Sequence, residues 1–266
     1  MILGFSLTEI LINLGALSGC DIYKGNHEHA SKKRSRVTCM FCFHGQSISF
    51  GLVPMRIISL SEVNQHVAAG EVAEVLRSGG VAAVPTDTVY GLVGLADHLK
   101  VVQKIFSIKK RPREKAFPIF VKDIAMARRY AYISDAKARI LEQVWPGAVT
   151  IVFHHKEKLP AELTAGGDKI VIRIPDHQFM RILMSKFGVP LVQTSANISG
   201  KPPAKNIAEL QSYFEGGEKP DVAVDAGEIT RSASTILDFT GSEPVMIRMG
   251  GSLKEFEELV ERMKEG

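Results

Sequence analysis

Residues 81–92 read VAAVPTDTVYGL, an apolar run followed directly by short polar side chains. Residues 81–84 are all apolar, which predicts a buried strand. Thr86, Asp87 and Thr88 follow the end of that strand, where ligands usually bind in α/β sheets. The alternative is a turn in which Asp and Thr cap the backbone locally. The stretch predicts an α/β fold with a candidate site at this strand end.

Strand and helix patterns alternate on both sides of this stretch, from Met55 to residue 266. The expected strands cover residues 55–58, 81–84, 148–153, 169–174, 189–194, 221–224, 234–239 and 245–249. Helices are expected to begin at Ser59 with Glu62, at Asp97, Ser134 and Asp176, and at Ser252 with Glu255. No linker or repeat interrupts the pattern, so residues 55–266 are predicted to form one α/β (α+β) domain.

The composition is that of an ordinary globular protein, with 45% of the 266 residues hydrophobic and 23% charged. A chain of this size can bury a core without disulfides or metals. The sequence contains no uninterrupted run of about 20 apolar residues, so no membrane span is predicted. The net charge of +4 is too small for general coating by nucleic acid but is compatible with a local basic groove.

Residues 1–54 differ in composition from the rest of the chain. All three cysteines lie here, and Cys39 and Cys42 form a single CxxC pair. Zinc and redox sites use such pairs, but no second pair and no strand-to-helix pattern accompanies this one. We expect an N-terminal extension that is disordered, or a start assigned too early, with Met55 as the alternative start.

Residues 109–115, KKRPREK, form a basic segment with five cations in seven positions. The segment follows a predicted helix, and cations complement the dipole of a helix C-terminus, so a solvated helix end is one interpretation. The other is a triphosphate clamp, because Arg presents a planar fork and Lys a compact charge to phosphate oxygens. The segment alone does not decide between the two.

Two further polar features lie in or beside predicted strands. Residues 194–203, TSANISGKPP, follow an apolar strand, and their hydroxyls and amide suit a phosphate or a ribose, or else a polar turn. Arg173 and Arg248 each lie inside an apolar strand, where an arginine needs an ionic partner or an anionic ligand.

Several common motifs are absent from the sequence, namely the P-loop, GxGxxG and HExxH. His154, His155 and His177 lack the spacing of metal ligands and are expected at the surface. No metal-ligating residue is predicted.

Between Gly80 and Gly250 the order and spacing of the motifs resemble the YrdC family. Each motif alone is weak evidence, but the combination is specific. The matching strings are PTDTVYGL at 85–92, K-x-R at 109–111, WPG at 145–147, RIP at 173–175, SANISG at 195–200 and STI at 234–236.

This resemblance implies a single catalytic domain with a twisted mixed β-sheet and covering helices around a concave basic cavity. It implies condensation of L-threonine, bicarbonate and ATP into threonylcarbamoyl-AMP and pyrophosphate, with Mg²⁺ as a cofactor. The product would serve threonylcarbamoyladenosine modification of tRNA by a separate transferase complex. A cytoplasmic location and direct contact with tRNA or double-stranded RNA are also implied.

The resemblance also assigns roles to particular residues. The signature tetrad of the family matches Lys109, Arg111, Ser195 and Asn197, which are the expected catalytic residues. The expected contacts to ATP are Arg111, Lys115, Ser195 and Arg248. The expected contacts to L-threonine are Thr88, Arg173 and Ser234, with Arg173 as the partner of the carboxylate.

The sequence departs from the family pattern at two places. Pro203-Ala204-Lys205 stands where many relatives have Ser-Pro-Thr, and Phe120 stands where some have a histidine near threonine. Two rival functions remain open: an RNA-binding module of the same fold, and a paralogue with another acyl-adenylating activity. The single tryptophan and the lack of interleaved aromatic and basic residues argue against the first. The intact tetrad argues against the second.

Overall fold

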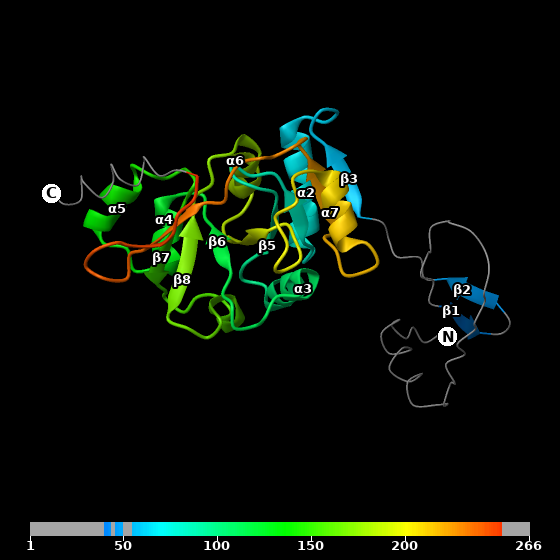
Figure 1. Cartoon of the computed structure of the whole chain (residues 1–266), viewed down its shortest axis with the longest axis horizontal. Coiled ribbons are helices and arrows are strands. Elements are labelled where there is room, and N and C mark those ends of the chain that lie inside the picture. The colour runs from blue at the N-terminus through cyan, green and yellow to red at the C-terminus, as the bar shows by residue number, and fades with distance from the viewer. Residues whose placement is uncertain (1–39, 44–45, 50–54, 252–266) are drawn as a thin grey trace, which may run out of the picture. The chain divides into compact units, whose positions relative to one another are not determined.

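The computed structural model describes residues 40–43, 46–49 and 55–251 (Figure 1). The chain divides into two units, Met1–Phe50 and Gly51–Gly266. In the first unit, β1 (Met40–Phe43) and β2 (Gln46–Ser49) pair as an antiparallel hairpin that the sequence does not predict. Most of residues 1–54, and the helix expected from Ser252, lie outside the described residues. The character of the extension and the domain boundary at Met55 stay predictions.

The second unit contains one ten-stranded sheet in the order β12-β11-β7-β8-β6-β9-β5-β4-β10-β3. Its strands are β3 (Arg56–Ser59), β4 (Ala82–Val84), β5 (Gly91–Leu95), β6 (Pro118–Phe120), β7 (Val149–His154), β8 (Lys169–Arg173), β9 (Leu191–Ser195), β10 (Val222–Asp225), β11 (Thr235–Asp238) and β12 (Val245–Arg248). Parallel pairs such as β11–β7 occur beside antiparallel pairs such as β7–β8. The mixed α/β sheet is confirmed, while the concave basic cavity stays a prediction.

Helices cover this sheet. They are α2 (Gln65–Arg77), α3 (Leu99–Lys109), α4 (Ile124–Tyr130), α5 (Asp135–Leu141), α6 (Gln178–Ser185) and α7 (Ile207–Phe214), with a 3₁₀ turn at η1 (Ala161–Thr164). Within residues 40–43, 46–49 and 55–251, no helix combines the length and the apolar character needed to cross a membrane.

One of the predicted helix caps within residues 55–251 is confirmed. The side chain of Ser134 accepts a hydrogen bond from the backbone N–H of Lys137 and so caps α5. The start expected at Ser59 is wrong, because this residue ends β3. Helix α2 begins later, behind Asn64, whose side-chain oxygen accepts from the second helical N–H. An Asn at this position satisfies a donor that the helix itself leaves unpaired.

The starts expected at Asp97 and Asp176 are also wrong. Helix α3 begins behind His98 without a side-chain cap. The backbone N–H of Asp176 donates to the Asp87 carboxylate, and its side chain accepts from Arg181, so it is committed to other partners. A capping pattern in the sequence does not show whether the carboxylate will cap the helix or take a side-chain partner, which for Asp176 is Arg181 in the same helix.

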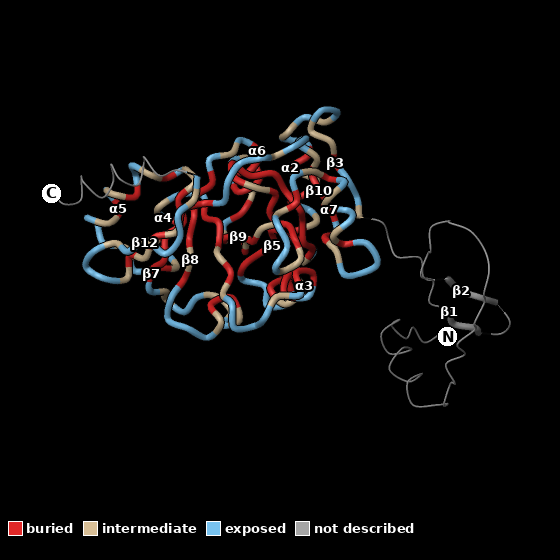
Figure 2. The backbone as a smooth tube through the Cα atoms, viewed as in Figure 1, coloured by how far each residue is buried: buried red, intermediate tan, exposed pale blue. Residues whose placement is uncertain are grey.

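Alternate residues of the central strands face two apolar cores, because side chains of a strand point to opposite faces of the sheet. Ala82 and Val84 of β4 join the core formed with α2 and α6. Ala83, between them, joins the core that contains α3 and α7. Figure 2 shows the buried residues concentrated along β5 and β9 between these layers. Helices therefore cover both faces of the sheet in this region.

The sequence does not predict β5 or β6 as strands, nor α4 or α7 as helices. β5 reads GLVGL, and glycine has little preference for strands. Gly94 is needed for packing, because a Cβ atom there would lie 2.3 Å from Cγ1 of Val101 in α3. The close approach of α3 to the sheet thus depends on a residue that weakens the strand pattern.

β5 pairs with both β4 and β9, and this brings two polar segments together. Gly91 lies opposite Ser195 in the antiparallel pair of β5 and β9. The backbone N–H of Ala196 donates to the carbonyl of Tyr90 at 2.7 Å. The polar ends of residues 85–90 and 195–200 therefore lie side by side, although about a hundred residues separate them in sequence.

Candidate active site

Lys109, Ser195 and Asn197 form a buried polar cluster where α3 meets the end of β9. The Nζ of Lys109 donates to the carbonyl oxygens of Ser195 at 2.7 Å and Asn197 at 3.1 Å, and to Oδ1 of Asn197 at 2.7 Å. The same Oδ1 accepts from Oγ of Ser195 at 2.6 Å. Only 2% of Lys109 is exposed. Three of the four tetrad residues therefore contact one another directly.

The local fold explains why this lysine lies in the interior. Lys109 is the last residue of α3, and Lys110 adopts a left-handed conformation with φ of 49° that turns the chain away. The N–H of Ser199 donates to the Lys109 carbonyl at 2.8 Å, which satisfies an acceptor at the helix end. Burial, and after it the charge of Arg111, lower the pKa of Lys109 from 10.5 to about 7.

Arg111, the fourth tetrad residue, binds its own loop. Its Nε donates to the carbonyl of Lys115 at 3.2 Å and its Nη2 to the carbonyl of Ala116 at 2.8 Å. The guanidinium lies 4.8 Å from the centre of the Phe117 ring, a cation–π arrangement. Burial lowers the pKa of Arg111. The side chain of Lys115 is exposed to solvent. The basic segment is therefore a loop held by its own hydrogen bonds, and its first residue, Lys109, is buried.

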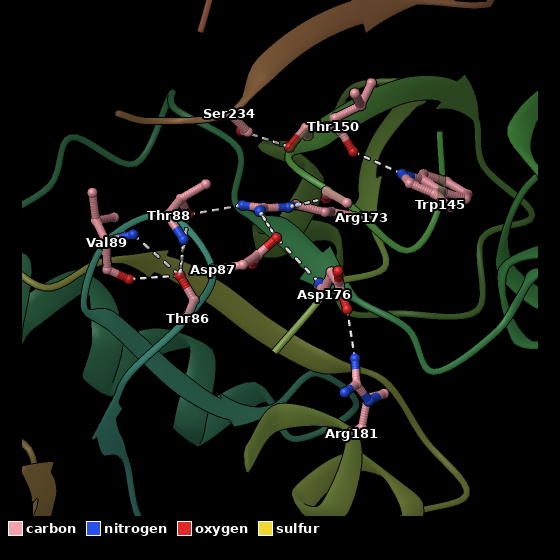
Figure 3. A network of polar contacts seen from close by, with 12 residues as sticks. Thr86, Asp87, Thr88, Val89, Trp145, Thr150, Arg173, Asp176, Arg181 and Ser234 are labelled. Atoms are coloured by element: carbon pink, nitrogen blue, oxygen red, sulfur yellow. Dashed lines mark hydrogen bonds and ion pairs between the residues drawn. The ribbon is translucent and has the colours of Figure 1, made fainter. Parts of the chain in front are cut away.

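Arg173, at the end of β8, is the centre of a second cluster (Figure 3). Its Nη2 donates to Oδ2 of Asp87 at 2.7 Å, its Nη1 to Oγ1 of Thr88 at 3.0 Å, and its Nε to the carbonyl of Gly147 at 2.9 Å. The side chains of Arg173 and Asp87 are 4% and 6% exposed. Burial lowers the pKa of Arg173, and the Asp87 carboxylate opposes this effect.

Ser234, immediately before β11, lies beside the Arg173 cluster (Figure 3). Its Oγ shares a hydrogen bond of 2.8 Å with Oγ1 of Thr150, and its carbonyl accepts from Nη2 of Arg248 at 2.8 Å. The charge of Arg248 contributes to the lowered pKa of Arg173, so the two cations lie close enough to affect each other. Thr88, Arg173 and Ser234, the three residues expected to contact threonine, are thus brought together.

The expected ATP contacts are less closely grouped. Arg111 and Lys115 belong to one loop, and Ser195 joins the Lys109 cluster. Arg248 binds Ser234 instead, and burial lowers its pKa. Among residues 55–251, no hydrogen bond or ion pair links Arg248 to the other three. The two clusters share the 85–90 segment, because Thr88 contacts Arg173 and Tyr90 contacts the backbone after Ser195.

The structure adds two residues to the assigned site: Asp87, which the sequence placed in a polar run without a role, and Thr150, which it did not single out. Asp87 forms the ion pair with Arg173, and its Oδ1 is buried without a hydrogen-bond partner within the described residues. Its position inside the polar run at residues 86–88 was a usable signal. Thr150 fixes the hydroxyl of Ser234, but it lies within an apolar strand, and nothing in its own sequence context distinguishes it.

The two departures from the family pattern lie beside these clusters. The backbone N–H of Ala204 donates to the carbonyl of Ala196 at 2.9 Å, so this segment packs on the residues that follow β9 without supplying a hydroxyl. Phe120 is fully buried, and its ring centre lies 5.8 Å from the guanidinium of Arg173. An aromatic ring attracts a guanidinium placed over its face, whereas a protonated histidine at this position would repel it.

Two cavities found in the described residues are not lined by the expected site residues, and no group of metal ligands is found there. A cavity of about 300 Å³ is lined by residues that follow β6 and β8 and by α6, and none of the expected site residues lines it. In the described part of the chain, no group of three or more His, Cys, Asp or Glu side chains could hold a metal ion. His154 is exposed as expected, but His177 is half-buried before α6, and burial lowers its pKa.

Comparisons with known proteins agree with these observations. The Sua5_yciO_yrdC family model, described as "Telomere recombination", matches residues 74–250. The threonylcarbamoyl-AMP synthase of Bacillus subtilis is 35% identical over 188 residues, which cover 70% of this chain and 54% of the relative. The threonylcarbamoyl-AMP synthase of Yersinia enterocolitica is 32% identical over 167 residues, which cover 62% of this chain and 87% of the relative.

Solved structures show the same similarity. The crystal structure of Pyrococcus abyssi Sua5 complexed with L-threonine matches with a TM-score of 0.71 and 30% identity, covering 78% of this chain and 61% of that one. The Escherichia coli YciO structure, at 22% identity and a TM-score of 0.68, shows a similar fold. This chain spans a little over half the length of the Bacillus relative. Because the family model covers well over half of the chain, this protein belongs to the Sua5/YciO/YrdC family.

Proposed function

We propose that this protein is a threonylcarbamoyl-AMP synthase, which condenses L-threonine, bicarbonate and ATP into threonylcarbamoyl-AMP and pyrophosphate. The observation that carries the proposal is the buried Arg173 cluster with Thr88 and Ser234, which shares the 85–90 segment with the Lys109 cluster at the start of the basic loop. The relatives from Bacillus subtilis and Yersinia enterocolitica bear this name, and Pyrococcus abyssi Sua5 has been solved with L-threonine.

The amino acid would bind at the Arg173 cluster. A guanidinium has five N–H donors, and the described contacts of Arg173 use three of them. The two others suit a carboxylate, since both charge and planar geometry match. The hydroxyls of Thr88 and Ser234 are short polar groups that would recognise the amine or hydroxyl of threonine.

The nucleotide would bind between the basic loop and the turn after β9. We assign Arg111, Lys115, Ser195 and Arg248 as contacts to ATP, and Lys109 and Asn197 as further members of the catalytic set. Arg248 donates to Ser234, so one residue assigned to ATP adjoins one assigned to threonine. This adjacency supports transfer between the two substrates.

The chemistry needs no protein nucleophile. The amine of threonine attacks bicarbonate and gives a carbamate and water, and a carbamate oxygen then attacks the α-phosphorus of ATP while pyrophosphate leaves. Negative charge builds on phosphate oxygens during the second step, and pre-positioned cations stabilise it. Holding a labile carbamate against the phosphorus is mainly a task of positioning. Arg111 and Arg248, both fixed by backbone carbonyls, suit these tasks.

The Mg²⁺ expected from the family resemblance does not fit as an ion held by the protein. Mg²⁺ is usually bound by one or two carboxylates together with substrate phosphates. The carboxylate of these clusters, Asp87, is paired with Arg173, and residues 55–251 offer no group of three acidic or histidine ligands. We propose that any Mg²⁺ arrives bound to the triphosphate, and we derive no step through it.

The proposal extends to the fate of the product. We propose that threonylcarbamoyl-AMP passes to a separate transferase complex that modifies tRNA, and that the protein works in the cytoplasm. Direct binding of tRNA or double-stranded RNA is the alternative activity.

The test is mass-spectrometric detection of threonylcarbamoyl-AMP made by the purified protein from ATP, L-threonine and bicarbonate. We expect product and pyrophosphate only when all three substrates are present. Pyrophosphate release that depends on another acid in place of threonine would identify a paralogue with a different substrate. No nucleotide turnover, with retained RNA binding, would identify an RNA-binding protein.

A further inference from the structure

When it is protonated, Lys109 places a positive charge in the interior without an anion in contact to balance it. Its Nζ contacts three oxygens, and all three belong to neutral groups of Ser195 and Asn197. A buried charge is normally paired, because removal from water costs more than neutral hydrogen bonds return. The groups in contact with Lys109 thus leave its positive charge without a counter-ion.

The charged groups around Lys109 do not supply the missing anion. The charged group that shifts the pKa of Lys109 is Arg111, a second cation, which lowers it. Residues 195–200, two of which contact its ammonium, contain no ionisable side chain, and the ammonium of Lys201 lies over the ring of Tyr213. In the same turn, Oγ of Ser199 is buried without a hydrogen-bond partner in the described structure. An unbalanced cation and an unpaired hydroxyl donor point to one anionic ligand.

The protonation state of Lys109 also sets how many of the three oxygens of Ser195 and Asn197 its Nζ can donate to. An ammonium has three N–H donors, which match the three oxygens it contacts. A neutral amine has two donors and would leave one of these oxygens without its contact. Because the oxygens belong to Ser195 and Asn197, loss of the proton loosens the two residues that stand at the proposed nucleotide site.

We propose that Lys109 is a positioning residue whose ammonium holds Ser195 and Asn197 in place, and that a bound polyphosphate supplies its missing anion, so that nucleotide binding drives proton uptake by Lys109. The proposal rests on the nucleotide site assigned above. With a pKa of about 7, Lys109 is largely neutral at pH 8 to 8.5 in the free protein. A neighbouring polyphosphate favours the charged form and raises that pKa. Uptake should therefore approach about one proton per bound nucleotide at pH 8.5 and vanish near pH 6.

The experiment is calorimetric titration of the full chain with ATP, without threonine or bicarbonate, in buffers of different ionisation enthalpy. The proton number is read from the dependence of the binding enthalpy on the buffer, at pH 6, 7.5 and 8.5. ATP is fully ionised at pH 8.5, so uptake there belongs to the protein. Pyrophosphate is titrated in parallel, because the proposal requires the phosphates alone to produce the effect.

Matched variants identify the group. Lys109→Met removes the ammonium at nearly constant length and should abolish the uptake at pH 8.5. Lys104→Met makes the same change on the same helix, at a lysine paired with Asp221 outside the clusters, and should leave the uptake unchanged. If Lys109→Met does not fold, the pH series on the unaltered protein and on Lys104→Met still decides.

The proposal is overturned if the unaltered protein binds ATP at pH 8.5 without taking up a proton, if it binds neither ATP nor pyrophosphate, or if Lys109→Met retains the uptake. These results are separable from the proposed function. A protein that makes threonylcarbamoyl-AMP but shows no uptake refutes only the role of Lys109. A protein that shows the uptake but makes no such product refutes only the reaction.

Discussion

At the scale of single residues, the Arg173 cluster depends on a buried ion pair. Asp87 and Arg173 are almost completely shielded from water, and Asp87 also accepts from the backbone of Asp176. A buried pair adds little net stability compared with apolar packing, but removal of one partner leaves an uncompensated charge. Asp87 therefore matters chiefly because it balances the charge of Arg173 and orients its guanidinium.

Asp87→Asn should lower the free energy of unfolding by about 3–5 kcal/mol, because it leaves the Arg173 charge buried and unpaired. Chemical denaturation at pH 7 measures this loss. Asp176→Asn is the matched control, since its pair with Arg181 is more than half exposed, and its effect should stay below about 1 kcal/mol. Equal, small losses in the two variants would contradict the described ion pair.

The pKa of Lys109 predicts a pH dependence of stability. Below about pH 7 the lysine is charged in both the folded and unfolded states, so the cost of burying the charge is present in full. Between about 7 and 10.5 the unfolded chain binds a proton that the folded chain lacks, so stability rises with pH. The unfolding free energy of the ligand-free protein, minus that of Lys109→Met, should therefore increase from pH 7 to 9. A flat difference would show that Lys109 keeps an ordinary pKa.

At the scale of elements, the end of β12 is packed directly on the residues that present Ser234. A Cβ atom at Gly250 would lie 2.3 Å from the carbonyl oxygen of Ala233 and 2.4 Å from the backbone N of Thr235. The N–H of Gly250 also donates to Oγ1 of Thr235 at 3.0 Å. Glycine is required here because the two backbone segments lie so close together. Their close approach, together with the pairing of β11 and β12, keeps Arg248 in contact with Ser234.

Gly250→Ala should displace Ser234 and reduce kcat/KM for threonine by about 10- to 100-fold, since small misplacements of site groups are costly. Gly241→Ala, in the exposed connection between the same strands, is the control, because the nearest backbone atom lies 3.6 Å from its Cβ. Its kinetics should match those of the unaltered protein. Threonine-dependent pyrophosphate release measures both, and a fully active Gly250→Ala would remove β12 from the site.

At the scale of the whole molecule, both clusters and the two cores lie within residues 55–251. β3 begins at Arg56, and Met55 packs against one of the cores. The first unit contributes none of the assigned residues. All the residues proposed for substrate binding and catalysis thus belong to the second unit.

A protein that begins at Met55 should fold and keep the threonine-dependent turnover of the full chain. The comparison needs the thermal midpoint and the rate of pyrophosphate release of both forms. Loss of solubility or of turnover in the shorter form would show that residues 1–54 contribute to the fold or to the reaction.

The sequence by itself determined the local elements with strong patterns. The strand expected at 81–84 and observed at 82–84, the cap at Ser134 and the existence of the helix at 178–185, though not its start, follow from apolar periodicity or capping chemistry, which act over a few residues. The order of the family motifs likewise located the polar segments. β5 escaped prediction because Gly94, which α3 packing requires, weakens its pattern.

Only the tertiary structure decided which polar groups meet. Lys109 contacts Ser195 across 86 positions, Arg173 contacts Thr88 across 85, and Ser234 contacts Thr150 across 84. Such pairs depend on the strand order, which no local pattern encodes, since antiparallel and parallel partners have the same side-chain period. Burial followed from the same contacts: the sequence allowed Lys109 to be a solvated helix end, and its contacts with Ser195 and Asn197 place its side chain in the interior.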